Sequence, residues 1–410
     1  MPLPIRYPSF APRAAIAGQW GVIALGLSIP VSVALDNILL GLIALLWLAG
    51  GEWRGKAALI RHNPVAIAAL VLFGLLAAGA LYSSGNTGVL FKYIDLLFIP
   101  VFLAYFQDAK TRERALLAFC CAAIASILVS YLAYMDLLLH STLLPRESIN
   151  PNGFKASVTH SLIVGFAAYV FALRARDEQN RTLRAAYIAL MLIAAHNVIF
   201  MIWGRTGYLV LASLFLYFFA VTLGRRGMAL GVALFAAIFL TAYVASASIQ
   251  QRANDAVRQF KAWEPGTPST DSIGERLEYW GNSLQIIREQ PLLGSGTGSF
   301  PDVYARAVAG RGMLATVNPH NEYLLIAVQI GLVGLASLVY LFYRQWRCAG
   351  RLAGVFYRDL GRGVVLTFVV GCLFNSLLLD HTEGLLYAWL SALAFAAPAQ
   401  PPPSPAGAAS

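Results

Sequence analysis

Residues 318–343 read NPHNEYLLIAVQIGLVGLASLVYLFY. From Tyr323 to Tyr343 this run carries no charged side chain, and a bilayer is spanned by about 20 apolar residues in a helix. The stretch therefore predicts a membrane helix with a histidine, His320, at its mouth.

Similar apolar runs recur along the chain, which is 58% hydrophobic and only 12% charged. Soluble domains carry about one quarter charged residues, so the composition indicates an all-α polytopic membrane protein. We predict about twelve spans, near 15–30, 32–49, 64–82, 91–106, 115–139, 157–173, 186–203, 207–223, 228–247, 321–343, 363–379 and 384–397.

These spans divide the chain into four parts. Residues 1–248 hold spans one to nine, 249–320 form one large loop, and 321–397 hold spans ten to twelve. The Pro/Ala/Ser-rich tail, 398–410, is expected to be disordered.

Loop charges predict the orientation. With the N-terminus in the cytoplasm, nineteen basic residues fall in inside loops, and only four, Lys92, Arg146, Lys155 and Arg205, fall in short outside loops. Loops as long as 249–320 cross the membrane largely regardless of charge. We therefore expect this loop and His320 to face the periplasm or the cell exterior.

The net charge of +10 raises the possibility of nucleic-acid binding. The basic residues lie in short loops between spans, and the chain has no soluble basic domain, so we expect no nucleic-acid partner. None of the four cysteines lies in the large loop, which argues against a disulfide framework there. The first apolar run lacks a cleavage site, so no cleavable signal peptide is expected.

The large loop has helical patterns of its own. Ile249–Trp263 suits an amphipathic helix at the membrane surface. Ser272-Ile-Gly-Glu275 is typical of a capping box, and the helix behind it should stop before Pro291. Gly294–Gly298 then predicts a flexible turn, followed by a short helix through Val303 and Ala307.

His320 is the first candidate for chemistry. Asn318 can cap the following helix and Pro319 suits its first position, which would place His320 in the first turn. The positive end of the helix dipole favours a neutral imidazole there, and a neutral imidazole can act as a general base. The alternative is an interfacial histidine that only anchors the helix end.

Two arginines are candidates for binding an anion. Arg205, within Gly204-Arg-Thr-Gly207, lies between two spans at the predicted outer membrane edge, where it can bind a phosphate bidentately. Its alternative is a snorkelling arginine that marks the interface. Arg276 flanks the apolar stripe of the predicted loop helix and can turn toward a ligand or toward water.

Other polar groups carry weaker signals. Gly294–Gly298 resembles a phosphate-binding loop but lacks a following Lys-Ser/Thr, so a flexible hinge is favoured. Asp380, His381 and Glu383, with His320 and Glu322, allow a metal site, although structural capping fits their irregular spacing better. Asp380 or Glu383 can alternatively orient His320.

Several further polar residues lie at predicted span ends or within spans. His160 and His196 fall within spans, where helix–helix hydrogen bonding is the favoured explanation over function. Residues expected to contact sugar in one short outside loop are His140, Arg146, Asn150, Asn152 and Lys155.

Taken in order, the motifs resemble the O-antigen ligase/polymerase superfamily. The resemblance rests on Gly204-Arg-Thr-Gly207, Arg276-x-x-x-Trp280, Pro291-Leu-Leu-Gly294-x-Gly296-x-Gly298-x-Phe300, His320-Asn321-x-x-Leu324 and Gly331-Leu-Val-Gly334-Leu335. It covers most of the chain and implies a C-type glycosyltransferase-like fold that works without a metal or other cofactor.

The resemblance also implies a reaction and its partners. Members transfer glycan from undecaprenyl pyrophosphate to an acceptor, and the ligases that use lipid A-core resemble this chain best. His320 is then the base and Arg205 and Arg276 bind the pyrophosphate, with inversion at the sugar. Asn321 and Tyr323, and Arg146 and Lys155, are expected to contact substrate.

Three functions therefore stand as hypotheses: an O-antigen ligase, an O-antigen polymerase with a second carrier-linked glycan as acceptor, and a transporter or flippase for a lipid-linked sugar. A transporter would be favoured by broken helices in mid-membrane and by inverted repeats. Membrane lipids are the expected surroundings of the chain. No extramembrane dimerisation element is visible, so a monomer is expected.

Overall fold

The computed structural model describes residues 12–135, 152–202 and 204–397, and the elements within them are helices. Arg146, His140, Asn150 and the tail 398–410 lie outside the described residues. The helices are α1 (Pro12–Ser28), α2 (Val33–Ala49), α3 (Trp53–His62), α4 (Pro64–Leu81), η1 (Thr87–Tyr93), α5 (Asp95–Tyr105), α6 (Ala109–Tyr134), α7 (Ser157–Asp177), α8 (Arg181–His196), η2 (Asn197–Met201), α9 (Arg205–Ala245), α10 (Ala247–Ala262), α11 (Ser272–Glu289), α12 (Phe300–Val308), α13 (Glu322–Ala349), α14 (Val355–Gly371) and α15 (His381–Phe395).

Many of these helices are apolar enough to cross a membrane. Within the described ranges, seven are long enough as well, or eight if α2 and α3, bent by 114°, count as one span. One of the seven, α9, runs for 41 residues through a kink at Gly224 and covers two of the predicted spans. The shorter helices α1, α2, α14 and α15 lie on other predicted spans. The chain is an all-helical polytopic membrane protein, while the count of twelve spans stays a prediction.

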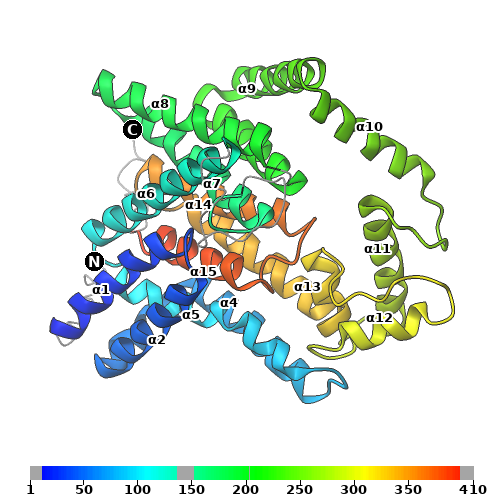
Figure 1. Cartoon of the computed structure of the whole chain (residues 1–410). Coiled ribbons are helices and arrows are strands. Elements are labelled where there is room, and N and C mark those ends of the chain that lie inside the picture. Colours follow the sequence, from blue (N-terminus) through cyan, green and yellow to red (C-terminus); the bar gives the residue numbers. More distant parts are fainter. Residues whose placement is uncertain (1–11, 136–151, 203, 398–410) are drawn as a thin grey trace, which may run out of the picture.

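The centre of the bundle is α15, with α5, α13 and α14 packed around it (Figure 1). Its side chains are buried on all sides, as expected of a helix that is apolar all round. Trp389 is fully buried and its indole N–H donates to the carbonyl of Val22 at 2.9 Å. This bond attaches α1 to the core helix.

Polar side chains inside the bundle are paired with one another. His160 of α7 lies 2.9 Å from the Asn197 side-chain oxygen and 3.1 Å from the Ser126 hydroxyl. His196 lies 2.7 Å from the Tyr131 hydroxyl. Helix–helix hydrogen bonding, predicted for both histidines, is confirmed.

The basic loops predicted to lie inside meet at one end of the bundle. Arg176 pairs with the buried carboxylate of Asp359 at 2.6 Å, and Arg174 pairs with Glu113. The Tyr357 hydroxyl donates to Glu113 at 3.0 Å. These contacts join the start of α6, the end of α7 and the start of α14, next to loops that the charge pattern assigned to one side of the membrane.

The region 247–308 forms the predicted helices α10, α11 and α12. Figure 1 shows α10 continuing outward from α9 before the chain returns through α11 and α12 beside α13. The predicted capping box is wrong by one residue. The Asp271 carboxylate caps α11 by accepting the N–H groups of Ile273 at 3.2 Å and Gly274 at 2.8 Å. A carboxylate suits this position because it also complements the helix dipole.

Candidate functional site

The structure brings Arg205, Arg276 and His320 together from three separate elements. Arg205 is the first residue of α9, Arg276 lies in the second turn of α11, and His320 precedes α13. One guanidinium nitrogen of Arg205 lies 3.5 Å from the hydroxyl of Ser272, at the start of α11. The charge of Arg205 acts on Arg276, and that of Arg276 acts on His320. The three predicted residues therefore lie close enough for their charges to interact.

The two guanidinium groups lack an acidic partner. In the part of the chain that the structure describes, no carboxylate lies within ion-pair distance of Arg205 or Arg276. Partial burial lowers the pKa of Arg276, and the positive charge of Arg205 lowers that pKa further. An arginine still keeps its proton at neutral pH. The pair is thus a concentration of positive charge that favours an anion.

His320 lies before α13 rather than in its first turn, so the predicted cap is wrong. Asn321 is the N-cap, and its side chain accepts the N–H of Leu324 at 3.1 Å. Asn318 instead accepts the backbone N–H of His320 at 2.8 Å, and His320 has a φ of 51°. This left-handed conformation is incompatible with an α-helix, so the helix begins only at Glu322.

We predicted that the helix dipole keeps the His320 imidazole neutral, but two other effects lower its pKa. Burial lowers the pKa of His320 from its ordinary value of 6.5, and the positive charge of Arg276 lowers that pKa further. At neutral pH the imidazole is therefore uncharged and has a nitrogen that can accept a proton. The Tyr279 ring lies beside it, with the ring centroids 6.4 Å apart.

A loop between α14 and α15 holds the site together, and the sequence offered no pattern that singled it out. The Asn375 side chain donates to the hydroxyl of Thr206, next to Arg205, at 2.7 Å. The neighbouring Ser376 hydroxyl donates to the Asn318 side chain at 2.7 Å. Two adjacent residues thus connect the start of α9 with the turn that carries His320. Their only sequence signal is an Asn-Ser pair inside an apolar run.

Two more contacts position the elements that carry the arginines and the histidine. The Trp280 indole donates to the carbonyl of Pro319 at 3.1 Å and so ties α11 to the histidine turn. Before α9, the π-helix η2 begins at Asn197, whose side chain donates to Ser130 at 2.8 Å and lies 2.9 Å from His160. Single-turn π-helices are frequent near functional sites.

The glycine-rich loop is not the flexible hinge we predicted. The backbone N–H groups of Ser295 and Gly296 bond to carbonyls of α13 at 2.9 Å and 2.7 Å, and that of Thr297 bonds to Gly79 of α4 at 3.1 Å. The N–H of Gly298 bonds to the Gln329 side chain at 2.6 Å. These donors are occupied within the protein, so they do not cradle a phosphate.

The loop fills a break in α13. Gly331 has a φ of 65°, and a Cβ atom there would lie 2.1 Å from the Leu292 carbonyl oxygen. The N–H of Leu332 bonds to the Pro291 carbonyl at 2.8 Å. Two of the motifs quoted above, at 291–300 and 331–335, therefore pack directly on each other.

Asp380, His381 and Glu383 lie at the start of α15, where Glu383 is buried, His381 is partly buried and Asp380 is exposed. Glu383 accepts a hydrogen bond from Thr159, and His381 lies 3.7 Å from the Asp95 carboxylate. Within the described ranges, no group of three or more His, Cys, Asp or Glu side chains is arranged to hold a metal ion. No hydrogen bond among these residues joins Asp380 or Glu383 to His320. The second hypothesis, that one of them orients His320, thus gains no support.

The remaining predicted contact residues have polar groups bound within the protein. The Asn321 side chain donates to Leu373 at 3.0 Å, and the Tyr323 hydroxyl donates to Val369 at 2.9 Å. Lys155 pairs with Asp36 at 3.6 Å and donates to Thr382 at 3.3 Å. Contact of these residues with substrate stays a prediction.

Comparison with known proteins finds a family match over the part of the chain that holds the three candidate residues. Residues 186–339 match the family model described as O-Antigen ligase, and this range contains Arg205, Arg276 and His320. A stretch of 108 residues is 31% identical to a protein of Haemophilus influenzae that is named only as uncharacterized. That stretch covers 25% of this chain and 27% of the relative. Over residues 186–339, the chain is thus similar to the O-antigen ligase family.

Proposed function

We propose that the protein is an O-antigen ligase. It transfers a glycan from undecaprenyl pyrophosphate to lipid A-core at the periplasmic face of the inner membrane. The observation that carries the proposal is the unpaired Arg205–Arg276 couple next to a neutral His320. A diphosphate leaving group is the anion that such a couple suits, because guanidinium groups bind phosphate oxygens bidentately.

The reaction is a single displacement at the anomeric carbon. A hydroxyl oxygen of the acceptor bonds to this carbon as the bond from the carbon to the phosphate oxygen breaks. The electron pair of that bond leaves with the pyrophosphate, and the configuration at the sugar inverts. No metal or cofactor is called for in this scheme.

The two arginines stabilise the leaving group. Negative charge grows on the bridging oxygen as the bond breaks, and fixed positive groups lower the energy of that transition state. Loss of one preorganised group of this kind typically costs about 10²–10³-fold in rate.

His320 takes the proton of the acceptor hydroxyl. Burial lowers the pKa of His320, and the same Arg276 that binds the diphosphate lowers it further, so the base is ready before the acceptor arrives. General base catalysis contributes about 10²–10⁴-fold. The proton leaves to water once the product has departed.

The break in α13 does not favour a transporter. The carbonyls of Val328 and Gln329 at this break accept hydrogen bonds from Ser295 and Gly296. In transporters, unwound carbonyls coordinate the transported ion or substrate. Here they are bound to the protein's own loop.

The test is transfer by purified protein in lipid nanodiscs, with undecaprenyl-pyrophosphate glycan and lipid A-core. His320→Ala should lose at least about 100-fold in rate. His62→Ala, on the exposed end of α3, should transfer at the wild-type rate. A folded His320→Ala protein with near wild-type transfer would contradict the assignment of the base.

A deletion strain separates ligase from polymerase. Core without polymer, with polymer accumulating on the carrier, supports ligation. Core that carries a single repeat unit would show instead that the protein is a polymerase.

A further inference from the structure

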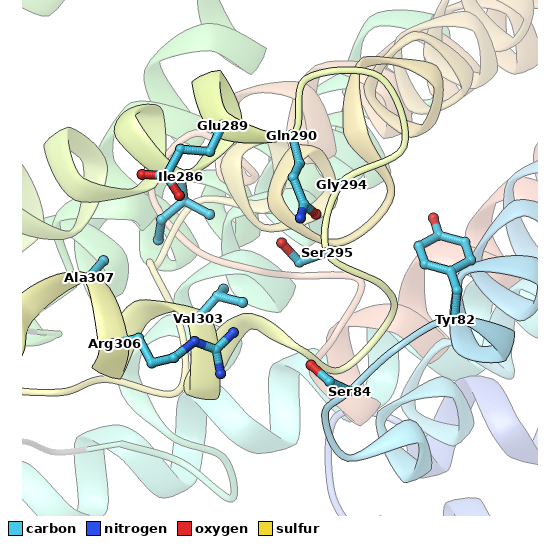
Figure 2. A pocket seen from close by; sticks show the side chains of 10 residues that line it. All are labelled: Tyr82, Ser84, Ile286, Glu289, Gln290, Gly294, Ser295, Val303, Arg306 and Ala307. Carbon is cyan, nitrogen blue, oxygen red and sulfur yellow. The ribbon is translucent and has the colours of Figure 1, made fainter.

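A cavity of about 520 Å³ lies at the C-terminal end of α11, whereas Arg276 of the candidate site lies near the start of that helix. Figure 2 shows its lining side chains, which come from the end of α4, the end of α11, the glycine-rich loop and α12. Arg276 and Glu289 are thirteen residues apart on α11, which corresponds to about 20 Å along a helix. The cavity is therefore separate from the Arg205–Arg276–His320 site.

The lining is rich in hydrogen-bond donors and acceptors. It includes Tyr82, Ser84, Glu289, Gln290, Ser295 and Arg306. Among the residues that the structure describes, no hydrogen bond or ion pair occupies the side chains of Glu289, Gln290, Ser295 or Arg306. Planar groups of the carboxylate, amide and guanidinium type can each contact two neighbouring hydroxyls of a sugar.

Tyr82 adds an aromatic surface to this cavity. Its hydroxyl donates to the Leu293 carbonyl at 2.6 Å, which fixes the ring, and 48% of the residue is exposed. An aromatic ring with its hydroxyl already bonded offers an apolar face. The apolar C–H face of a sugar ring can stack there.

The wall of the cavity is held rigid by the rest of the fold. Gly294 and Ser295 belong to the loop that is hydrogen-bonded to α13 and α4. Ile286, Val303 and Ala307 form the apolar part of the lining. A preformed cavity of several hundred Å³ with a few polar groups is typical of a small-ligand site.

We propose that this cavity binds a short, hydroxyl-rich oligosaccharide, with Arg306, Glu289 and Gln290 as hydrogen-bonding groups and Tyr82 as the stacking surface. The sugars held there are remote from the bond that reacts. This proposal depends on the proposed function in one respect: the oligosaccharide is taken to be part of the glycan substrate. The cavity would then select long glycans and add affinity without taking part in the chemistry.

The experiment measures binding separately from transfer. The full chain in nanodiscs is titrated with oligosaccharides cleaved from the undecaprenyl carrier of the host strain, and saturation-transfer NMR and calorimetry report contact and affinity. Arg306→Ala and Gln290→Ala should each weaken binding, Arg306→Ala by at least about tenfold. Arg288→Ala is the matched control, because Arg288 is exposed on α11 and does not line the cavity.

Its outcomes are distinct from those of the proposed function. Equal affinity of Arg306→Ala, Gln290→Ala and wild-type protein would overturn the cavity site, as would the absence of binding to wild-type protein. His320→Ala should bind these oligosaccharides with unchanged affinity while it transfers nothing. Binding at the cavity without any transfer by the wild-type protein would refute the ligase and leave this inference standing.

Discussion

The Ser376 hydroxyl donates a 2.7 Å hydrogen bond to the side-chain oxygen of Asn318, and the same oxygen accepts the backbone N–H of His320 at 2.8 Å. A serine from the α14–α15 loop thus determines the conformation of the turn that carries the proposed base. Ser376 is fully buried, so water cannot replace its hydroxyl without rearrangement.

We expect Ser376→Ala to lower the rate of transfer about tenfold with little change in the KM for either substrate. The physical reason is that the Asn318 turn loses one of its two donors, and a single buried hydrogen bond is worth about 0.5–1.5 kcal/mol. Steady-state kinetics check this. Ser213→Ala, in α9, is the control, since its hydroxyl donates to the Val210 carbonyl of its own helix at 2.8 Å. An equal loss of transfer rate in Ser376→Ala and Ser213→Ala would indicate a general effect on folding.

His320→Gly should separate backbone strain from chemistry. A left-handed φ costs a side chain about 1 kcal/mol that glycine does not pay. We expect His320→Gly to unfold at the same temperature as wild type or higher, and above His320→Ala, while transfer is lost. Added imidazole should restore part of the transfer in the glycine variant. Thermal unfolding in detergent and a rescue titration measure both effects.

The pH dependence of transfer should have an acidic limb below the ordinary histidine pKa of 6.5. The base works only when unprotonated, and burial and Arg276 lower the pKa of His320, so activity persists to lower pH and then falls as the pH drops through that value. Arg276→Gln removes a positive charge, so the acidic limb should move upward, toward 6.5. The pH profile of kcat/KM for the residual activity reports this. A limb that stays in place would show that Arg276 does not act on His320.

Gly331→Ala should destabilise the protein by at least about 2 kcal/mol. The new Cβ would lie 2.1 Å from the Leu292 carbonyl oxygen, and the φ of 65° disfavours any side chain. Gly281→Ala on α11 is the matched control, because a Cβ there meets no atom within 4 Å. That control should be neutral or stabilising by about 0.5–1 kcal/mol, since alanine favours a helix. Chemical denaturation in detergent compares the two.

The order of the helices could be predicted from the sequence, and so could the choice of three candidate residues for the site. Apolar runs of bilayer length must form helices, because lipid cannot satisfy backbone hydrogen bonds, and the seven helices long enough to cross a membrane in the described ranges lie on such runs. Arg205, Arg276 and His320 could be chosen as candidates because few charged or titratable groups lie at the predicted outer span ends and beside the apolar stripe of the loop helix.

What the tertiary structure decided is how the loops between those runs are held. The glycine-rich segment was predicted to be a hinge because its sequence shows no partners for its backbone N–H groups. In the structure these groups donate to Gly79 and Gln329, which are distant in the sequence. His320 was predicted to lie in the helix because local sequence does not show the contact that supports its left-handed turn. That contact is the hydrogen bond from Ser376 to Asn318, which joins residues 58 positions apart. Local patterns report local hydrogen bonds and apolar periodicity. Contacts between distant segments exist only once the bundle has formed, and in this protein they place the proposed base beside its arginines.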